Sequence, residues 1–203
     1  MTIWFTSDTH FYHHNVIQYS NRKIYLDAPA GWIPKFKERR EICEDMNNLL
    51  INNWNSVIQP LDEVYHLGDF SFAGHDATQK VLDRLHGIKY LIRGNHDYDF
   101  VKRHENEFVW IKDYYVLKVH DKTLEEKQYH QHIVMCHFPF QSWENMTHGF
   151  WHLHGHSHGK MPSGNTKRYD VGVDNNNLMP ISYQQVKEIM RERDNISRPD
   201  RNS

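Results

Sequence analysis

Short, nearly continuous apolar runs recur along the chain. Such runs suit β-strands buried on both faces of a sheet, because a half-exposed strand would alternate between apolar and polar residues. The strands expected on this basis are Thr2–Thr6, Glu63–Leu67, Lys89–Arg93, Phe108–Ile111, Tyr114–Val119, His130–Cys136, Trp151–Leu153 and Arg168–Val173.

Longer segments with helical spacing lie between some of these runs. Over Lys35–Asn55 the apolar residues recur at the period of a helix with one buried face. Further helices are expected at Ala77–Leu85, directly after Asp97, and at Ser182–Arg193, where Ser182 suits the N-cap. Helices alternate with strands early and strands dominate later, which predicts an α/β fold of two packed sheets flanked by helices.

Length and composition favour one soluble domain. The chain has 203 residues, which fits a single domain over 1–194 followed by a polar C-terminal tail over 195–203. No apolar stretch is long enough to span a bilayer, and the first strand begins without a basic leader, so we expect a cytoplasmic protein without membrane contact. The two cysteines form no disulfide pattern, which agrees with that location.

Charge and histidine content narrow the function classes. The formal net charge is −2, so the chain has no general affinity for nucleic acid. The 17 histidines are unusual, and neutral imidazole is the most common transition-metal ligand in proteins.

Five polar clusters follow five of the expected strands. In open α/β sheets, ligands gather beyond the carboxyl ends of the strands. Strand side chains alternate faces, so we expect Asp8 and His10 to reach one ion together, and likewise His156 and His158. The clusters are Asp8-Thr9-His10, Gly68-Asp69, Gly94-Asn95-His96-Asp97, His137, and Gly155-His156-Ser157-His158.

In this order the clusters resemble the pattern of the calcineurin-like metallophosphoesterase superfamily, which is D-x-H, G-D, G-N-H-[DE], a lone H, and G-H-x-H. All parts are present between Asp8 and His158, about three-quarters of the chain. The resemblance implies a four-layer α/β/β/α sandwich with two mixed sheets flanked by helices.

The resemblance also implies a set of ligands for two adjacent divalent ions. Asp8, His10 and His158 would bind one ion. Asn95, His137 and His156 would bind the other, with Asp69 bridging the two. His96 would stabilise charge on the phosphate or act as a general acid, and Asp97 would orient His96 through a hydrogen bond.

Such a pair of ions clamps a phosphoryl group and makes a bridging hydroxide available near neutral pH. Carboxylate, amide and imidazole ligands suit Mn²⁺, which we favour, and also Fe, Zn²⁺, Co²⁺ or Ni²⁺.

The second cluster indicates which branch of the superfamily the chain resembles. It reads Gly68-Asp69-Phe70-Ser71-Phe72-Ala73-Gly74 and lacks the Asp-Arg pair of the protein phosphatases and the diadenosine tetraphosphate hydrolases in this superfamily. The sequence of the motifs resembles instead that of the small stand-alone phosphoesterases of bacteria and phages. We therefore expect a phosphodiesterase acting on a small nucleotide-type diester. The alternatives are a phosphomonoesterase with the same metal centre and a catalytically weak metal-binding scaffold.

Residues that touch the substrate are harder to assign. His14 follows the first cluster and could help hold a phosphate, although loop histidines are usually solvated. Arg93 precedes Gly94 and could face the site, and a strand-end ion pair is equally open. His148 lies in the loop before the last cluster, and such loops often form a substrate wall. An aromatic residue of the same loop, Phe140 or Trp143, could stack on a base, but a locally packed hydrophobic loop is the somewhat favoured alternative. The oligomeric state is left open.

Overall fold

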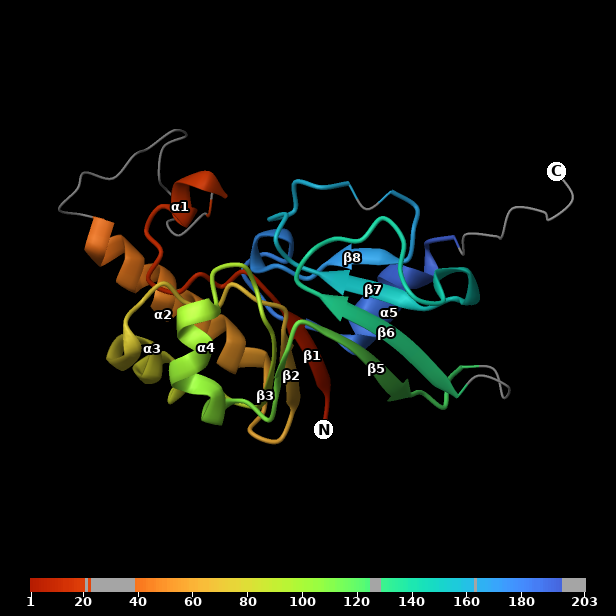
Figure 1. Ribbon diagram of the computed structural model, residues 1–203, viewed down its shortest axis with the longest axis horizontal. Coiled ribbons are helices and arrows are strands. Elements are labelled where there is room, and N and C mark those ends of the chain that lie inside the picture. The colour runs from red at the N-terminus through yellow and green to blue at the C-terminus, as the bar shows by residue number, and fades with distance from the viewer. Residues whose placement is uncertain (21, 23–38, 125–128, 163, 195–203) are drawn as a thin grey trace, which may run out of the picture.

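The computed structural model describes residues 1–20, 22, 39–124, 129–162 and 164–194. Its strands form two sheets (Figure 1). The five-stranded sheet has the order β4-β3-β2-β1-β9, with β1 to β4 parallel and β9 antiparallel to β1. Its strands are β1 (Ile3–Thr6), β2 (Glu63–His66), β3 (Ile88–Ile92), β4 (Ile111–Lys112) and β9 (Ile181–Ser182).

The second sheet has four strands in the order β5-β6-β7-β8. β5 is antiparallel to β6, whereas β6, β7 and β8 are parallel. These strands are β5 (Tyr114–His120), β6 (His130–Cys136), β7 (Trp151–His154) and β8 (Arg168–Asp170).

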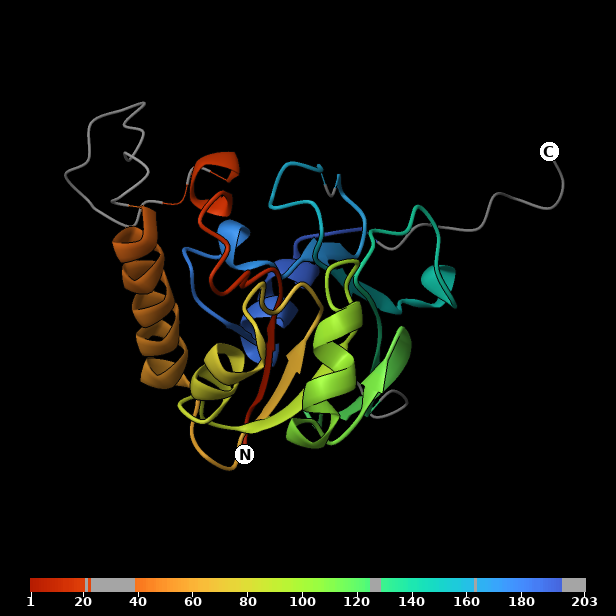
Figure 2. The same ribbon diagram turned by 60° about the vertical axis from the view of Figure 1, so that its left-hand side comes forward.

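Helices flank the sheets. Figures 1 and 2 show α2, α3 and α4 gathered on the side of β1–β3 that faces away from β5–β8. The α-helices are α1 (Val16–Tyr19), α2 (Arg39–Val57), α3 (His75–Leu82), α4 (Tyr98–His104) and α5 (Tyr183–Arg191). Three short 3₁₀ helices are η1 (Glu105–Glu107), η2 (Met146–His148) and η3 (Val173–Asn175).

Two hydrophobic cores follow from strand alternation. Val64 and Tyr65 are neighbours on β2, so their side chains point to opposite faces of the five-stranded sheet. Val64 packs with Trp54 of α2 in the core beneath the helices. Tyr65 packs with Met135 of β6 in the core between the two sheets, which α5 also enters. The five-stranded sheet is therefore buried on both faces, as its continuous apolar runs predicted.

The carboxyl ends of the strands meet at one edge of the molecule. An isolated parallel bridge pairs Ser7, just after β1, with Gly172, just after β8. The backbone N–H of Gly155, after β7, donates to the carbonyl of His137, after β6 (3.0 Å). The Ser7–Gly172 bridge thus joins the two sheets, and the Gly155–His137 hydrogen bond joins neighbouring turns of the four-stranded sheet.

The predicted fold class, an α/β protein with two mixed sheets flanked by helices, is confirmed. The N-cap at Ser182 is confirmed as well, because the Ser182 hydroxyl and the Gln185 side chain form a capping box at the start of α5. No helix among the described residues is long and apolar enough to cross a membrane.

Several boundaries differ from the prediction. The strand expected at Phe108–Ile111 begins only at Ile111, because the three residues between η1 and Ile111 form a bend and irregular backbone. The strand expected at Arg168–Val173 ends at Asp170, because the backbone leaves β7 there and Gly172 turns to pair with Ser7.

The remaining differences concern short or undescribed segments. β9 was not predicted, since two residues are too few to show a periodicity. α3 runs from His75 to Leu82 instead of Ala77–Leu85. The first residues of the helix expected over Lys35–Asn55, and the tail over 195–203, lie outside the described residues.

Candidate metal centre

The backbone of the clusters is unusual. Asp8, His10, Asp69, His156 and His158 all have positive φ angles, between 48° and 68°. Left-handed backbone is uncommon for residues other than glycine and costs about 1–3 kcal/mol per residue. Such strain persists where surrounding contacts impose it, and it is concentrated at functional sites.

These angles also correct one sequence argument. We expected Asp8 and His10 to point the same way because they are two apart on a strand, but β1 ends at Thr6 and both residues lie in the turn that follows. Their convergence is imposed by hydrogen bonds to the turn after β2. The Asp8 N–H donates to the Gly68 carbonyl (2.9 Å), and the His10 N–H donates to the Asp69 carbonyl (3.0 Å).

The first group of ligand atoms comes from Asp8, His10 and His158, and these atoms all lie within 4.8 Å of one another. Asp8 Oδ1 is 3.8 Å from His10 Nε2 and 3.9 Å from His158 Nε2. The His10 ring is buried, yet neither of its nitrogens has a hydrogen-bond partner among the described residues. Burial lowers the pKa of His10, which keeps a lone pair free. An unpartnered buried imidazole beside a carboxylate fits a metal ligand.

The second group centres on His137, which is fully buried. Its Nδ1 lies 2.7 Å from the Leu67 carbonyl, so when the ring is neutral the Nδ1–H donates to that carbonyl and the lone pair is on Nε2. This Nε2 lies 3.0 Å from Asn95 Oδ1, and His156 Nδ1 lies 3.0 Å from the same oxygen. A cation would satisfy these converging lone pairs together. His156 therefore faces a different group from His158, contrary to the expectation that both reach one ion.

Asp69 lies between the two groups. Its Oδ2 is 3.6 Å from His10 Nε2 and 3.5 Å from His137 Nε2, and its Oδ1 accepts from the backbone N–H of His96 (2.9 Å). Asp8, Asp69 and His137 also form a group that could hold an ion. Burial alone would raise the pKa of Asp69, but hydrogen bonding and charge interaction with His137 outweigh it and lower that pKa. Burial raises the pKa of Asp8 to about 7, and a cation beside this carboxyl would keep it ionised.

A carboxylate that the sequence analysis missed supports His158. Asp174, in η3, accepts a hydrogen bond from His158 Nδ1 (2.6 Å), which fixes the ring so that Nε2 faces Asp8. Asp174 is in turn paired with the buried Arg22 (2.7 Å). Arg22 also donates to the carbonyls of Asp8 (2.6 Å) and Thr9 (2.9 Å). Neither residue lies in a motif, so only the folded structure reveals them.

The position of Asp97 corrects its predicted role. Its buried carboxylate accepts hydrogen bonds from the backbone N–H groups of Asp69 (2.8 Å), Phe70 (2.9 Å) and Gly94 (2.7 Å). Within the described part of the chain it makes no hydrogen bond to His96. Asp97 precedes α4, and its side chain turns inward across the loops after β2 and β3. It therefore holds these two loops together and does not orient His96.

Two glycines allow the loops to approach. A Cβ atom on Gly94 would collide with the carboxylate of Asp69, and one on Gly155 would collide with the side chains of Ser7 and Asp8. At both positions any larger residue would displace a candidate ligand.

His96 lies at the rim of the centre and is exposed. Its ring centroid is 5.9 Å from that of His10 and 4.8 Å from that of Phe72. This position is accessible to a bound substrate.

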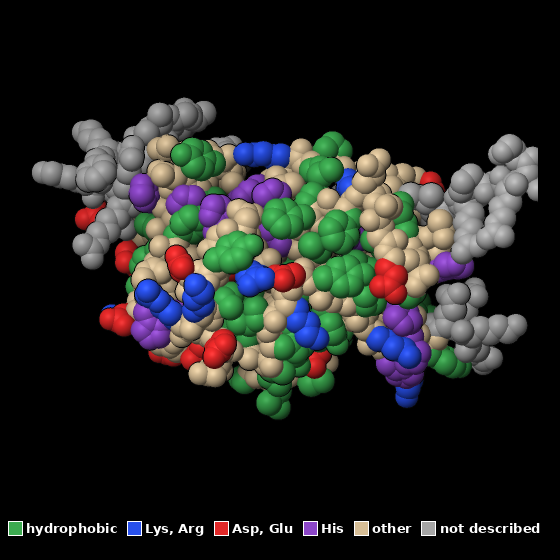
Figure 3. Space-filling view, viewed as in Figure 1, with side chains coloured by type: hydrophobic (Ala, Val, Ile, Leu, Met, Phe, Trp, Pro, Cys, Tyr) green, Lys and Arg blue, Asp and Glu red, His purple; other side chains and the backbone are tan. Residues whose placement is uncertain are grey.

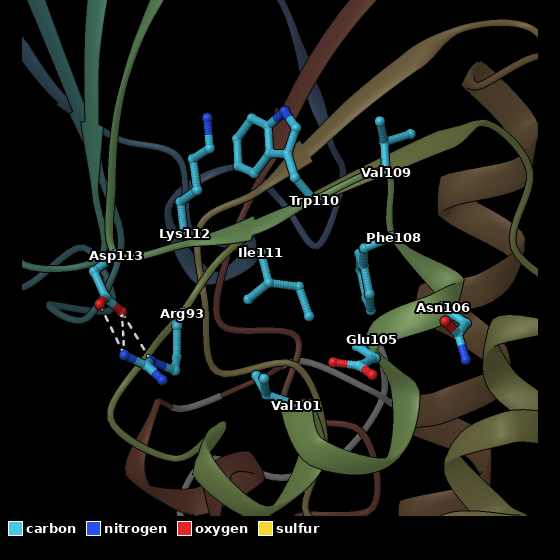
Figure 4. Close-up of a pocket in the computed structure, with 10 residues that line it drawn as sticks. All are labelled: Arg93, Val101, Glu105, Asn106, Phe108, Val109, Trp110, Ile111, Lys112 and Asp113. Carbon is cyan, nitrogen blue, oxygen red and sulfur yellow. Dashed lines mark hydrogen bonds and ion pairs between the residues drawn. The ribbon is translucent and has the colours of Figure 1, made fainter.

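Arg93 does not join the predicted centre. Its guanidinium pairs with Asp113 through Nε (2.8 Å) and Nη2 (2.7 Å), so the strand-end ion pair is the alternative that the structure favours. Figure 4 shows this pair at a separate cavity of about 580 Å³ between α4 and β4, which none of the candidate ligands line.

The remaining candidate substrate residues are of two kinds: exposed histidines and aromatic residues that pack against their neighbours. His14 is exposed one residue after His13, and His148 is exposed in η2, so their roles stay predictions. Phe140 stacks on the buried His152 (4.8 Å between ring centroids), and Trp143 donates to the Phe150 carbonyl (2.8 Å). These two aromatic residues pack locally.

The fold and the clustered aspartates and histidines define an α/β protein with a candidate metal centre. No family model matches the chain. The chain is 30% identical over 196 residues to the uncharacterized protein MJ1445 of Methanocaldococcus jannaschii, and the match covers 93% of this chain and 90% of that protein. It belongs to the same family as that protein.

A solved structure supports the fold. The crystal structure of AQ665 from Aquifex aeolicus, described as a protein of unknown function, matches with a TM-score of 0.64 at 22% sequence identity. The match covers 93% of this chain and 98% of that one. At this level of identity the similarity concerns the fold.

Proposed function

We propose that this protein is a dinuclear-metal-dependent phosphodiesterase of the calcineurin-like metallophosphoesterase superfamily, acting on a small nucleotide-type diester. The observation that carries the proposal is the position of Asp69 Oδ2, 3.6 Å from His10 Nε2 and 3.5 Å from His137 Nε2. One carboxylate oxygen between two buried imidazoles, each belonging to its own ligand group, suits a bridge between two ions.

The donor set fits two divalent cations, and Mn²⁺ is the ion we favour. Asp8, His10 and His158 would hold one of them. Asn95, His137 and His156 would hold the other, with Asp69 shared. When bound, such ions supply Lewis-acid polarisation of the phosphoryl group and a nucleophilic water of lowered pKa.

The protein's own residues supply positioning and proton transfer. Asp97 and Arg22 fix the turns that carry the ligands, so little reorganisation is needed when a phosphoryl group binds. His96 is an exposed imidazole at the rim, where it can donate a proton to the departing ester oxygen or stabilise its charge.

The test compares bis-p-nitrophenyl phosphate with p-nitrophenyl phosphate on metal-stripped protein to which Mn²⁺ is returned. We expect Mn²⁺-dependent hydrolysis with a preference for the diester. A preference for the monoester would replace the proposal with a phosphomonoesterase. Two bound ions without activity on a wide diester panel would favour a metal-binding scaffold.

The matched variants are Asp69→Asn and, as a control, Asp76→Asn at an exposed position of α3. Asp69→Asn should lower the occupancy of both ions and reduce activity at least about 100-fold. Elemental analysis and turnover are measured on the same samples. Full metal occupancy with normal turnover in Asp69→Asn would rule out the bridging role.

A further inference from the structure

Two phenylalanines with large exposed fractions lie directly against the candidate ligands. Phe72 is 40% exposed and Phe138 is 44% exposed. Exposing this much aromatic surface costs free energy, so its presence on both halves of a polar centre suggests a binding surface. Figure 3 shows histidine side chains gathered in a band across one face, with hydrophobic side chains beside them.

Phe72 borders the half of the centre that contains His10. Its ring centroid lies 5.2 Å from that of His10, 4.8 Å from that of His96 and 4.0 Å from that of His13. Phe72 and His96 also line a cavity of about 320 Å³ between the loop after β2 and α4. His13 stacks on one face of the Phe72 ring, with 14° between the ring planes, so a bound base would contact the part of the ring that borders this cavity, on the side of the proposed proton donor.

Phe138 borders the other half. It follows His137 directly, and its ring centroid lies 5.1 Å from that of His137 and 4.8 Å from that of His156. Phe140, two residues further along, is only half-exposed and stacks on His152. Phe138 is thus the aromatic residue of this segment that faces outward beside the ligands.

We propose that Phe72 and Phe138 are two stacking positions for the bases on either side of a linear dinucleotide-type diester, with the base of the leaving group on Phe72. This inference rests on the proposed function and names its substrate class. Aromatic side chains stack on any base, because every base has a π-face. The contact of Phe72 with His96 assigns it to the leaving-group side. The net charge of −2 gives no general affinity for a nucleic-acid polymer, which favours a short substrate with two bases.

The first test is equilibrium binding to the metal-stripped full-length protein. The probes are thymidylyl-thymidine and its abasic analogue. Both carry one phosphate, so the carboxylates of the centre repel them equally. This repulsion therefore cancels when the two affinities are compared as a ratio. We expect the wild type to bind the dinucleotide at least about tenfold more tightly than the analogue. Phe72→Ala and Phe138→Ala should each lower that ratio about fivefold or more.

The matched control is Tyr129→Ala. Tyr129 is 40% exposed, like Phe72, but lies beside the start of β6, whereas the centre lies beyond the end of that strand. Tyr129→Ala should leave the ratio of the two probe affinities unchanged. Circular dichroism checks that all three variants fold. If the phenylalanines merely shield the ligand histidines, both variants will weaken both probes equally, and the inference is overturned.

The second test separates the two positions kinetically in the presence of Mn²⁺. Methyl p-nitrophenyl phosphate has one aromatic group, on the leaving side. Phe72→Ala should raise its KM about fivefold or more, and Phe138→Ala should leave it unchanged. With thymidylyl-thymidine both variants should raise KM. The opposite pattern for the methyl ester would overturn the assignment of sides.

The two proposals fail in different ways. If the wild type hydrolyses no diester, the proposed function fails, while the binding test still decides whether the two phenylalanines recognise bases. If diesters are hydrolysed but the wild type binds the two probes equally, the phosphodiesterase stands and the stacking inference is wrong.

Discussion

Asp174 illustrates how single side chains that touch neither proposed ion prepare the centre. Its carboxylate accepts a hydrogen bond from His158 Nδ1 (2.6 Å) and forms an ion pair with Arg22 Nε (2.7 Å). The His158 ring is thereby fixed with Nε2 towards Asp8. Partners of this kind raise ligand basicity and set the ring orientation.

We predict that Asp174→Asn lowers Mn²⁺ affinity about 10- to 100-fold, because an amide accepts the His158 proton less strongly and no longer neutralises Arg22. The measurement is competition with a chelating dye on metal-stripped protein. Asp76→Asn serves as the control. An affinity equal to that of the wild type would show that His158 needs no support from η3.

At the scale of elements, the loops after β2 and β3 are held together by one buried carboxylate. Asp97 accepts from the N–H groups of Asp69, Phe70 and Gly94, and it forms the N-cap position of α4. Because Asp69 and Asn95 lie in these loops, the spacing between the proposed ions depends on this contact.

We predict that Asp97→Asn destabilises the fold by about 2–3 kcal/mol, since an NH₂ group must then face a backbone N–H. Urea unfolding measures the loss, and elemental analysis should show reduced occupancy of both ions. Asp99→Asn, two residues along at an exposed position, is the control. Unchanged stability combined with slow turnover would favour the role first expected from the sequence, in which Asp97 orients His96.

Strand ends could be predicted from the sequence, but the contacts between them could not. A buried strand leaves a continuous apolar run, and the polar cluster after it stands out, as with Asp69 after β2. The partners Arg22 and Asp174 are separated by 152 positions, and nothing local marks either one. The left-handed turn at Asp8 also left no signal, since aspartate is common in ordinary turns.

At the scale of the whole molecule, the proposed centre joins the two sheets. Asp8, Asp69 and Asn95 follow strands of the five-stranded sheet, whereas His137 and His156 follow strands of the four-stranded sheet. Any ion that binds ligands from both sheets therefore stabilises their packing as well as the site.

We predict that Mn²⁺ raises the midpoint of thermal unfolding and that a chelator lowers it. At a free ion concentration 100 times Kd, one site contributes about 2.7 kcal/mol. Differential scanning calorimetry of stripped and reloaded protein measures the shift, and Asp69→Asn should abolish most of it. A midpoint that does not respond to Mn²⁺ would argue against a site formed by both sheets.

A buried ion pair links the C-terminal helix to the four-stranded sheet. Lys187 of α5 binds the Asp121 carboxylate, which also accepts from the Tyr183 hydroxyl (2.9 Å) and the Thr123 hydroxyl (2.7 Å). Asp121 directly follows β5, and both members of the pair are buried. Burial alone would raise the pKa of Asp121, but the hydrogen bond from Lys187 outweighs it and holds that pKa well below its usual range.

A carboxylate with a depressed pKa contributes stability above its unfolded pKa of about 3.9, and this stability is lost as the pH falls through the lower folded value. We predict that Asp121→Asn costs about 3 kcal/mol at pH 7, because the buried Lys187 ammonium loses the negative charge beside it. The free energy of unfolding of the wild type should fall more steeply below about pH 4 than that of the variant. Urea unfolding from pH 7 to pH 3 measures both effects. Replacing both residues, as Asp121→Leu with Lys187→Met, should recover much of the stability lost at pH 7. Parallel pH profiles for the wild type and Asp121→Asn would show that the depressed pKa of Asp121 does not contribute to stability.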